Sequence, residues 1–217
     1  MNSKSFTQNI PEVFIITFLV LFPHFVPLPF YSYAVVCLVV IIFYLRGQNK
    51  TLRHLGLKRK GLTVPTFIVG IASALLWVVF NKWVYHPFIT HFFVVDQYTE
   101  YDFIRNKLTN LIITVVAVWI IGGFYEEIVF RGFIQTTICE WFGKSKHSFW
   151  LAGLVTSLLF GLYHWQQGIF GIVHSVLAGL LWTFLLWRYK GNLWYAIISH
   201  AVYDTIVLTM IYFRIVI

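Results

Sequence analysis

Seven predominantly apolar stretches, separated by polar or charged residues, divide the chain. They cover residues 12–27, 31–45, 64–83, 108–123, 149–164, 169–187 and 193–213. A helix of about 20 apolar residues crosses the hydrocarbon core of a bilayer, and the first two stretches are shorter than that. Only helices and closed barrels satisfy their backbone hydrogen bonds in lipid. The pattern therefore predicts an all-α, polytopic transmembrane helix bundle with about seven membrane segments, within a range of roughly six to eight.

The composition points to the same class of protein. Hydrophobic residues make up 59% of the 217 residues and charged residues 11%, and the mean hydropathy is +0.77. Water-soluble domains carry about 25% charged residues. The length suits one domain, so we expect residues 1–217 to form a single integral membrane domain. Cys37 and Cys139 both have mostly apolar neighbours in the sequence, which indicates no disulfide framework.

The net charge of +8 comes from basic residues concentrated between the apolar stretches. Six of the 16 lysines and arginines lie within residues 46–60, and further pairs lie within residues 144–146 and 188–190. The positive-inside rule places these three basic stretches and the N-terminus in the cytoplasm, and the connection of residues 84–107 outside. Anionic lipid headgroups suit such stretches. A nucleic-acid partner is not expected, because no recognition module accompanies the charge.

Two acids and an arginine follow the fourth apolar stretch: Glu126, Glu127 and Arg131. We call residues 126–131 the acidic motif. A charge at the bilayer centre costs roughly 2.5–3.5 kcal/mol on insertion scales, so it usually pairs, faces a cavity or takes part in chemistry. In an α-helix Glu127 and Arg131 stand four residues apart and can form a structural ion pair. The helical period turns Glu126 about 100° away, which leaves this acid to take up a proton or find another partner.

Histidines and one aspartate occur in the later stretches. His164 ends the fifth stretch, and His200 and Asp204 lie four residues apart on one face of the seventh. For His174, in the sixth stretch, packing and a place beside a cavity explain the position equally well. In lipid, ionisable groups gain most by converging on a hydrated cavity. A carboxylate and imidazoles around water indicate hydrolysis, in which Glu126 is the general base for a water that His164 also holds.

In the same interpretation, His200 and Asp204 stabilise the oxyanion that forms on a scissile carbonyl. One geometric question arises from the helix lengths. From the same membrane surface, a rise of 1.5 Å per residue places His164 about 24 Å deep and His200 about 12 Å deep. The two meet only if the fifth helix begins deeper or tilts strongly, or if residues 165–168 fold back.

Three motifs in this order resemble the CAAX prenyl protease and bacteriocin-processing (CPBP, or Abi) family of intramembrane endopeptidases. The motifs are Glu126-Glu127-x-x-x-Arg131, Phe160-x-x-x-His164 and His200-x-x-x-Asp204. The resemblance covers about residues 107–217. It implies that this region is the catalytic core of a protease, with the site among the last four membrane segments.

The resemblance also implies a role for each residue that matches a motif. Glu126 and His164 activate the water, His200 and Asp204 form the oxyanion site, and Arg131, with Glu127 beside it, supports the structure. The last motif position is often asparagine in the family, whereas here it is Asp204. An ionised aspartate cannot donate a hydrogen bond to an oxyanion, so Asp204 is either protonated or orients His200.

Two alternatives remain open at the level of sequence. Glu126, His164 and His200 form a chemically reasonable zinc set, although the chain lacks a His-Glu-x-x-His helix. We favour the metal-free mechanism and expect no cofactor. A membrane immunity or scaffold protein, or a small transporter, would use the same polar residues without catalysis. The chain shows no inverted repeat with paired half-segments, which weakens the transporter alternative.

The resemblance implies the partners as well. We expect a lipid bilayer, a membrane-associated peptide or protein substrate that is either lipidated or not, and a bacterial plasma membrane as the location. The sequence specifies neither the substrate nor the oligomeric state.

Overall fold

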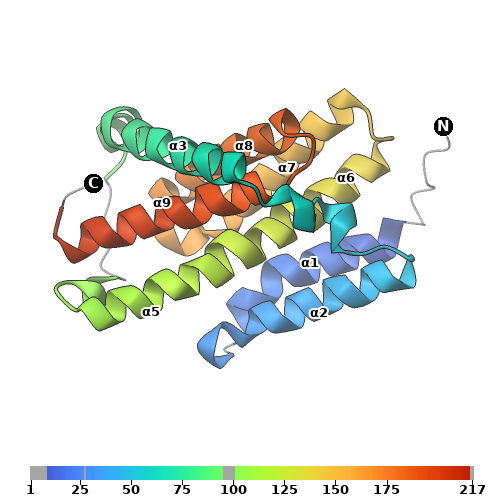
Figure 1. Ribbon diagram of the computed structural model, residues 1–217, viewed down its shortest axis with the longest axis horizontal. Coiled ribbons are helices and arrows are strands. Elements are labelled where there is room, and N and C mark those ends of the chain that lie inside the picture. The colour runs from blue at the N-terminus through green and yellow to red at the C-terminus, as the bar shows by residue number, and fades with distance from the viewer. Residues whose placement is uncertain (1–8, 27, 95–100, 216–217) are drawn as a thin grey trace.

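The computed structural model describes residues 9–26, 28–94 and 101–215. In these residues every regular element is a helix and no strand occurs, which confirms the all-α fold (Figure 1). The α-helices of this described part are α1 Ile10–Phe25, α2 Ser32–Gly47, α3 Val64–Phe80, α4 His86–Phe92, α5 Leu108–Val118, α6 Gln135–Trp141, α7 Lys146–Tyr163, α8 Gly168–Arg188 and α9 Trp194–Tyr212.

The elements α5 and α6 are the two ends of one continuous helix of 34 residues, Leu108–Trp141. Between these α-helices it has two π-helical segments, η7 Trp119–Glu126 and η8 Ile128–Ile134. A π-helix has wider turns with i→i+5 hydrogen bonds, and short π segments in α-helices often mark functional sites. The acidic motif lies where these two segments meet. We call Leu108–Trp141 the central helix.

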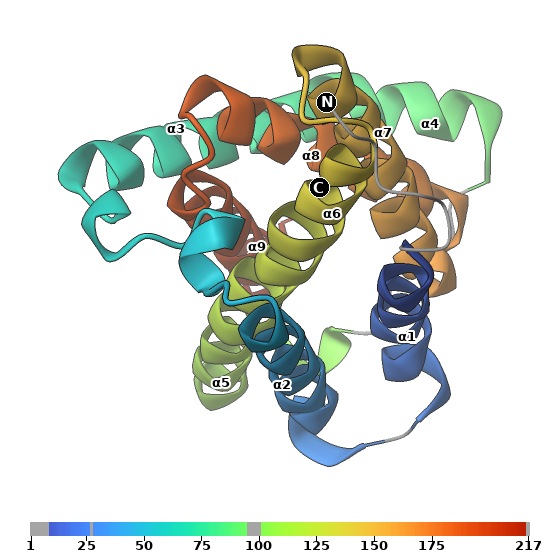
Figure 2. The same ribbon diagram turned by 90° about the vertical axis from the view of Figure 1, so that its right-hand side faces the viewer.

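The other helices pack around the central helix. In Figure 2, α1 and α2 lie on one side of it, and α3, α8 and α9 lie on the other. The helix α9 packs against α3, α5 and η7, while α7 packs against α6 and α8. A single 3₁₀ turn, Trp165–Gln167, joins α7 to α8, so these two helices run antiparallel. The last three helices therefore surround the acidic motif.

Four helices of the described residues are long and apolar enough to cross a membrane. They are Val64–Phe92, Leu108–Trp141, Trp165–Arg188 and Trp194–Tyr212. A fifth is counted if Ser32–Gly47 and Leu52–Gly61, which meet at 107°, are one broken span. In the described residues each of the seven predicted apolar stretches is mainly helical, but the count of about seven membrane segments is not confirmed. The helix α1 has only 16 residues, and α7 begins with polar residues.

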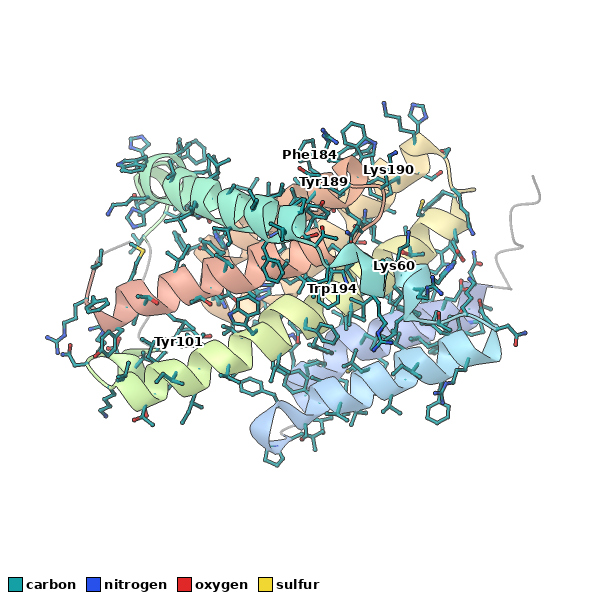
Figure 3. The ribbon with its side chains drawn as sticks, viewed as in Figure 1. Lys60, Tyr101, Phe184, Tyr189, Lys190 and Trp194 are labelled. Atoms are coloured by element: carbon teal, nitrogen blue, oxygen red, sulfur yellow. The ribbon has the colours of Figure 1, made fainter. Side chains whose placement is uncertain are left out.

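The three basic stretches meet at one end of the bundle, which we call the basic end. Lys50 Nζ and Lys144 Nζ lie 3.1 and 2.9 Å from the carboxylate of Glu140. The indole nitrogen of Trp194 donates to the carbonyl of Lys58 at 2.9 Å. Figure 3 shows the labelled Lys60, Lys190 and Trp194 in the right-hand half of the molecule and Tyr101 toward the other end. The predicted topology requires the three basic stretches to lie on the same side of the membrane, and their position at one end of the bundle agrees with it.

Close backbone contact joins the central helix to α9. A Cβ on Gly123 would lie 2.7 Å from the Cβ of Ala201 and 3.0 Å from the carbonyl oxygen of Ile197. Both distances are shorter than van der Waals contact allows. Transmembrane helices associate largely through such close packing of small residues, because lipid offers no hydrophobic driving force between helices.

We therefore expect Gly123→Val to lower the stability of the folded protein. The added side chain forces the central helix and α9 apart, and overpacking of this kind costs typically about 1–3 kcal/mol. The thermal unfolding midpoint of the purified protein in detergent measures the effect. Gly47→Val is the matched control, because nothing lies within 4 Å of a Cβ at Gly47. Equal midpoints for the two variants would contradict this packing.

Candidate active site

His200 is the centre of a buried polar cluster. Its Nδ1 lies 2.9 Å from Glu127 Oε1, at hydrogen-bond distance. Its Nε2 lies 3.5 Å from Asp204 Oδ2 and 4.0 Å from Glu126 Oε2. An ionised carboxylate only accepts hydrogen bonds, so with Glu127 ionised the Nδ1–H group is the donor. The other ring nitrogen, Nε2, then faces the two remaining acids.

Glu127 and Arg131 form the ion pair that the sequence predicts. Glu127 Oε1 and Arg131 Nη1 are 3.5 Å apart, and both side chains are fully buried. The guanidinium carbon lies 4.1 Å from the ring centre of Phe160 and 4.8 Å from that of Trp182. Within the described residues, the nitrogens of Arg131 make no hydrogen bond. The guanidinium of Arg131 is therefore stabilised largely by cation–π contacts with these two rings.

Trp182 connects this ion pair to the histidine. Its ring stacks on the imidazole of His200 with a centroid distance of 3.9 Å and an angle of 20°. Its indole nitrogen donates to Ser199 Oγ at 3.2 Å, and Ser73 Oγ donates to the same oxygen at 2.9 Å. The stack fixes the plane of the imidazole, so the direction of both ring nitrogens is set by packing.

Glu126 differs from its neighbour because its carboxylate has no hydrogen bond to any described residue. Its side chain is 11% exposed, and the side chain of Asp204 is 25% exposed. A Cβ on Gly122 would lie 2.7 Å from Asp204 Oδ2 and 3.6 Å from His200 Nε2. Because Gly122 has no side chain, Asp204 Oδ2 can approach the backbone of the central helix closely. The cluster is dry around Glu127 and reaches the surface near Asp204.

His164 lies close to this cluster, and among the described residues it makes no hydrogen bond or ion pair with Glu126. It follows the last residue of α7, and its Nδ1 is 2.9 Å from the carbonyl oxygen of Phe160. The ring of Phe160 lies 4.6 Å from the ring of His164 and 6.1 Å from that of His200. The ring of Phe160 therefore packs near both imidazoles. In the described part of the chain, His164 Nε2 makes no hydrogen bond, which leaves it available to water.

The sequence prediction did not find two contacts of this site. It assigned Glu127 to Arg131 alone and missed the hydrogen bond to His200, because it assumed an α-helical period through the acidic motif. It gave no role to Trp182, which appears in the sequence only as an aromatic residue in an apolar stretch. His174 accepts hydrogen bonds from Trp77 Nε1 at 3.2 Å and from Tyr203 Oη at 3.0 Å. These contacts favour the packing explanation for His174.

The geometry does not fit the alternative zinc set. Among the described residues, no group of three histidine, cysteine, aspartate or glutamate side chains is arranged to hold a metal ion. Glu126 and His200 approach each other, but His164 does not join them. We therefore derive no step of the mechanism through a metal.

The cluster therefore holds a carboxylate without a hydrogen bond to the described residues beside an imidazole of fixed orientation, within a bundle of apolar helices. Residues 108–206 match the family model described as Rce1-like, type II CAAX prenyl endopeptidase. The chain is also similar to the protein named "Putative membrane peptidase YdiL" from Bacillus subtilis (strain 168). The two are 28% identical over 178 residues, which is 81% of this chain and 68% of the relative. No solved structure matches the chain.

Both matches support the resemblance that the three motifs indicated, to the CAAX prenyl protease and bacteriocin-processing family. With the apolar helices, they support an integral membrane protease that acts on peptides. The roles of the individual site residues and the need for a metal stay predictions.

The buried ion pair yields a stability prediction. Arg131→Met leaves the carboxylate of Glu127 buried without its cation, and breaking a buried pair in this way costs about 3–5 kcal/mol. The double variant Glu127→Gln/Arg131→Met removes both charges, so we expect it to recover part of the loss. Thermal unfolding in detergent measures both effects.

Arg105→Met is the matched control for this experiment. Arg105 pairs with Asp102 at 2.8 Å, but both side chains are more than 40% exposed. Exposed pairs contribute about 0–1 kcal/mol. A loss for Arg131→Met no larger than for Arg105→Met would contradict the structural role of the buried pair.

Proposed function

We propose that the protein is a glutamic-type intramembrane endopeptidase in which Glu126 activates the attacking water. The proposal rests on the different surroundings of Glu126 and Glu127. Of two consecutive acids, Glu127 is held by Arg131 and His200, whereas Glu126 lies 4.0 Å from His200 Nε2 with a free carboxylate. A partly dry carboxylate without a permanent partner is suited to take a proton from water.

In the proposed reaction, the water lies between Glu126 and the free Nε2 of His164. Glu126 accepts one proton, and the resulting hydroxide forms a bond to the scissile carbonyl carbon. His200 donates a hydrogen bond from Nε2 to the oxyanion, which requires its protonated form. The three carboxylates around His200 favour that form. The C–N bond then breaks, and the proton on Glu126 moves to the leaving amine.

Asp204 has a positioning role in this proposal. At 3.5 Å from His200 Nε2, its carboxylate is a weak second acceptor for the Nε2–H group that donates to the oxyanion, and an ionised carboxylate does not itself donate. It therefore holds the imidazolium in the orientation that the incoming carbonyl requires. This is the second of the two roles that the sequence left open for Asp204.

The proposed substrate is a peptide or protein segment at the membrane, either lipidated or not. We propose that the basic end and the N-terminus face the cytoplasm of a bacterial cell, as the positive-inside rule requires. The similar protein from Bacillus subtilis is consistent with a bacterial plasma membrane.

Glu126→Gln tests the central assignment. We expect cleavage to fall about 10²–10⁴-fold, the usual contribution of a general base, while the fold is kept. Comparative peptidomics of membranes that contain the active protein or the variant identifies the products and measures their loss. Asp102→Asn is the control, because Asp102 is exposed and pairs with Arg105 outside the buried cluster. It should leave cleavage unchanged. Normal product levels in well-folded Glu126→Gln protein would exclude Glu126 as the base.

Two substitutions of Asp204 test its positioning role. Asp204→Asn keeps an oxygen that accepts from His200 Nε2, so we expect it to retain most cleavage. Asp204→Leu has a similar volume but no acceptor and should lose most of it. Product levels in the same membranes give the comparison. Equal activity of the two variants would show that the acceptor oxygen is not needed.

The metal alternative has its own test. Under the metal-free mechanism, purified active protein contains no stoichiometric zinc, and a chelator leaves its cleavage unchanged. Elemental analysis before and after chelation measures both quantities. One zinc per chain that Glu126→Gln removes would replace the glutamic mechanism by the metal-dependent one.

A further inference from the structure

A cavity of about 280 Å³ lies at the basic end, apart from the candidate active site. Its polar wall includes His54, Glu140 and Lys144, and its apolar wall includes Phe149 and Leu186. None of the residues assigned to catalysis lines it. The wall combines segments that are far apart in sequence, namely the 3₁₀ turn Leu52–Leu55, α6, α7 and α8.

Together with Lys50, which contacts Glu140 from outside the cavity, the polar wall has two lysines and one glutamate. Glu140 Oε2 lies 3.1 Å from Lys50 Nζ, while Glu140 Oε1 lies 2.9 Å from both His54 Nε2 and Lys144 Nζ. Two ammonium groups thus share one carboxylate. The side chain of Lys144 is 62% exposed, so its ammonium remains accessible to a second anion.

The surroundings of the cavity reinforce this excess. The basic end collects the six, two and two lysines and arginines of the three basic stretches. The acids described there are Glu140 and Glu12, and Glu12 accepts hydrogen bonds from Tyr44 and Trp141. The end of the bundle therefore attracts anions, which is the electrostatic condition under which juxtamembrane basic residues hold anionic lipids.

The apolar wall distinguishes the ligand from a soluble anion. Phe149 and Leu186 line the cavity. On other faces of the same end of α8, Phe184 and Trp187 are 45% and 42% exposed. Figure 3 shows Phe184 at the surface near Lys190. Aromatic residues next to basic ones are typical of the membrane interface. A volume of about 280 Å³ lies just below the range of about 300–1,000 Å³ that is usual for small-ligand pockets, which suits a headgroup region and not a whole lipid.

We propose that this cavity binds the phosphate and glycerol region of an anionic phospholipid. The phosphate contacts Lys144 and His54, and the first carbons of an acyl chain lie against Phe149 and Leu186. The rest of the lipid follows the outer surface of the bundle. Because Glu140 belongs to the central helix, the bound lipid stabilises the helix that also carries the acidic motif. This site does not depend on the proposed protease function.

Lipid binding by the purified full-length chain tests the proposal. The probes are phosphatidylglycerol and phosphatidylcholine with the same acyl chains, and native mass spectrometry counts the lipids retained. We expect phosphatidylglycerol to be retained preferentially and to raise the unfolding midpoint. Lys144→Gln should weaken its binding about fivefold, the usual effect of one basic charge near a lipid surface. Lys82→Gln, at an exposed lysine far from the basic end, is the matched control and should bind as the unchanged protein does.

A third variant separates lipid binding from general damage to the basic end. Glu140→Gln removes the acid that competes for Lys50 and Lys144, so phosphatidylglycerol should bind about fivefold more tightly. Damage alone would weaken it. Equal binding by Lys144→Gln and Lys82→Gln, or equal retention of phosphatidylcholine, would overturn the proposal. The same stabilisation by inorganic phosphate alone would also overturn it, because the ligand would then be a soluble anion.

Discussion

The structure depends on how the chain keeps one guanidinium in an apolar interior. Arg131 is fully buried and meets the carboxylate of Glu127 on one side and the faces of Phe160 and Trp182 on others. A buried ion pair stabilises a fold only when further interactions offset the loss of hydration. Here the hydrogen bond from His200 to Glu127 and the stack of Trp182 on His200 provide them. The charge thereby ties the central helix, α7, α8 and α9 together.

This arrangement separates the functions of two consecutive acids. In an α-helix neighbouring side chains diverge by about 100°. In the wider π turns of η7 and η8, Glu126 and Glu127 both reach the ring of His200, one at each nitrogen. Glu127 is then occupied by the interactions that hold the fold, and Glu126 is left free. The same histidine therefore links the structural part of the cluster to the part proposed to react with water.

The sequence predicted the helices and the side chains of the site better than their contacts. Apolar length located all seven helical stretches, and charge placement predicted that the basic stretches meet at one end, because both depend on local composition. The number of spans was not predictable, because α1 and α2 are short and α2 continues into a bent segment. The bond between Glu127 and His200 depends on the π turns and on the rotation of α9. No periodic pattern in the sequence encodes either feature.

The exposure of the side chains in the cluster increases from Glu127 and Arg131 to Asp204, and this increase indicates the side from which water reaches the cluster. The side chains of Glu127 and Arg131 are 0% exposed, those of His200 and Glu126 are 7% and 11% exposed, and that of Asp204 is 25% exposed. Electrostatic interactions are stronger in the dry part, where hydration does not screen the charges. The groups that must stay fixed lie there, and the acid proposed to exchange protons lies between them and the wet edge. In the proposed mechanism, water therefore approaches past Asp204, and it meets Glu126 before it meets the ion pair.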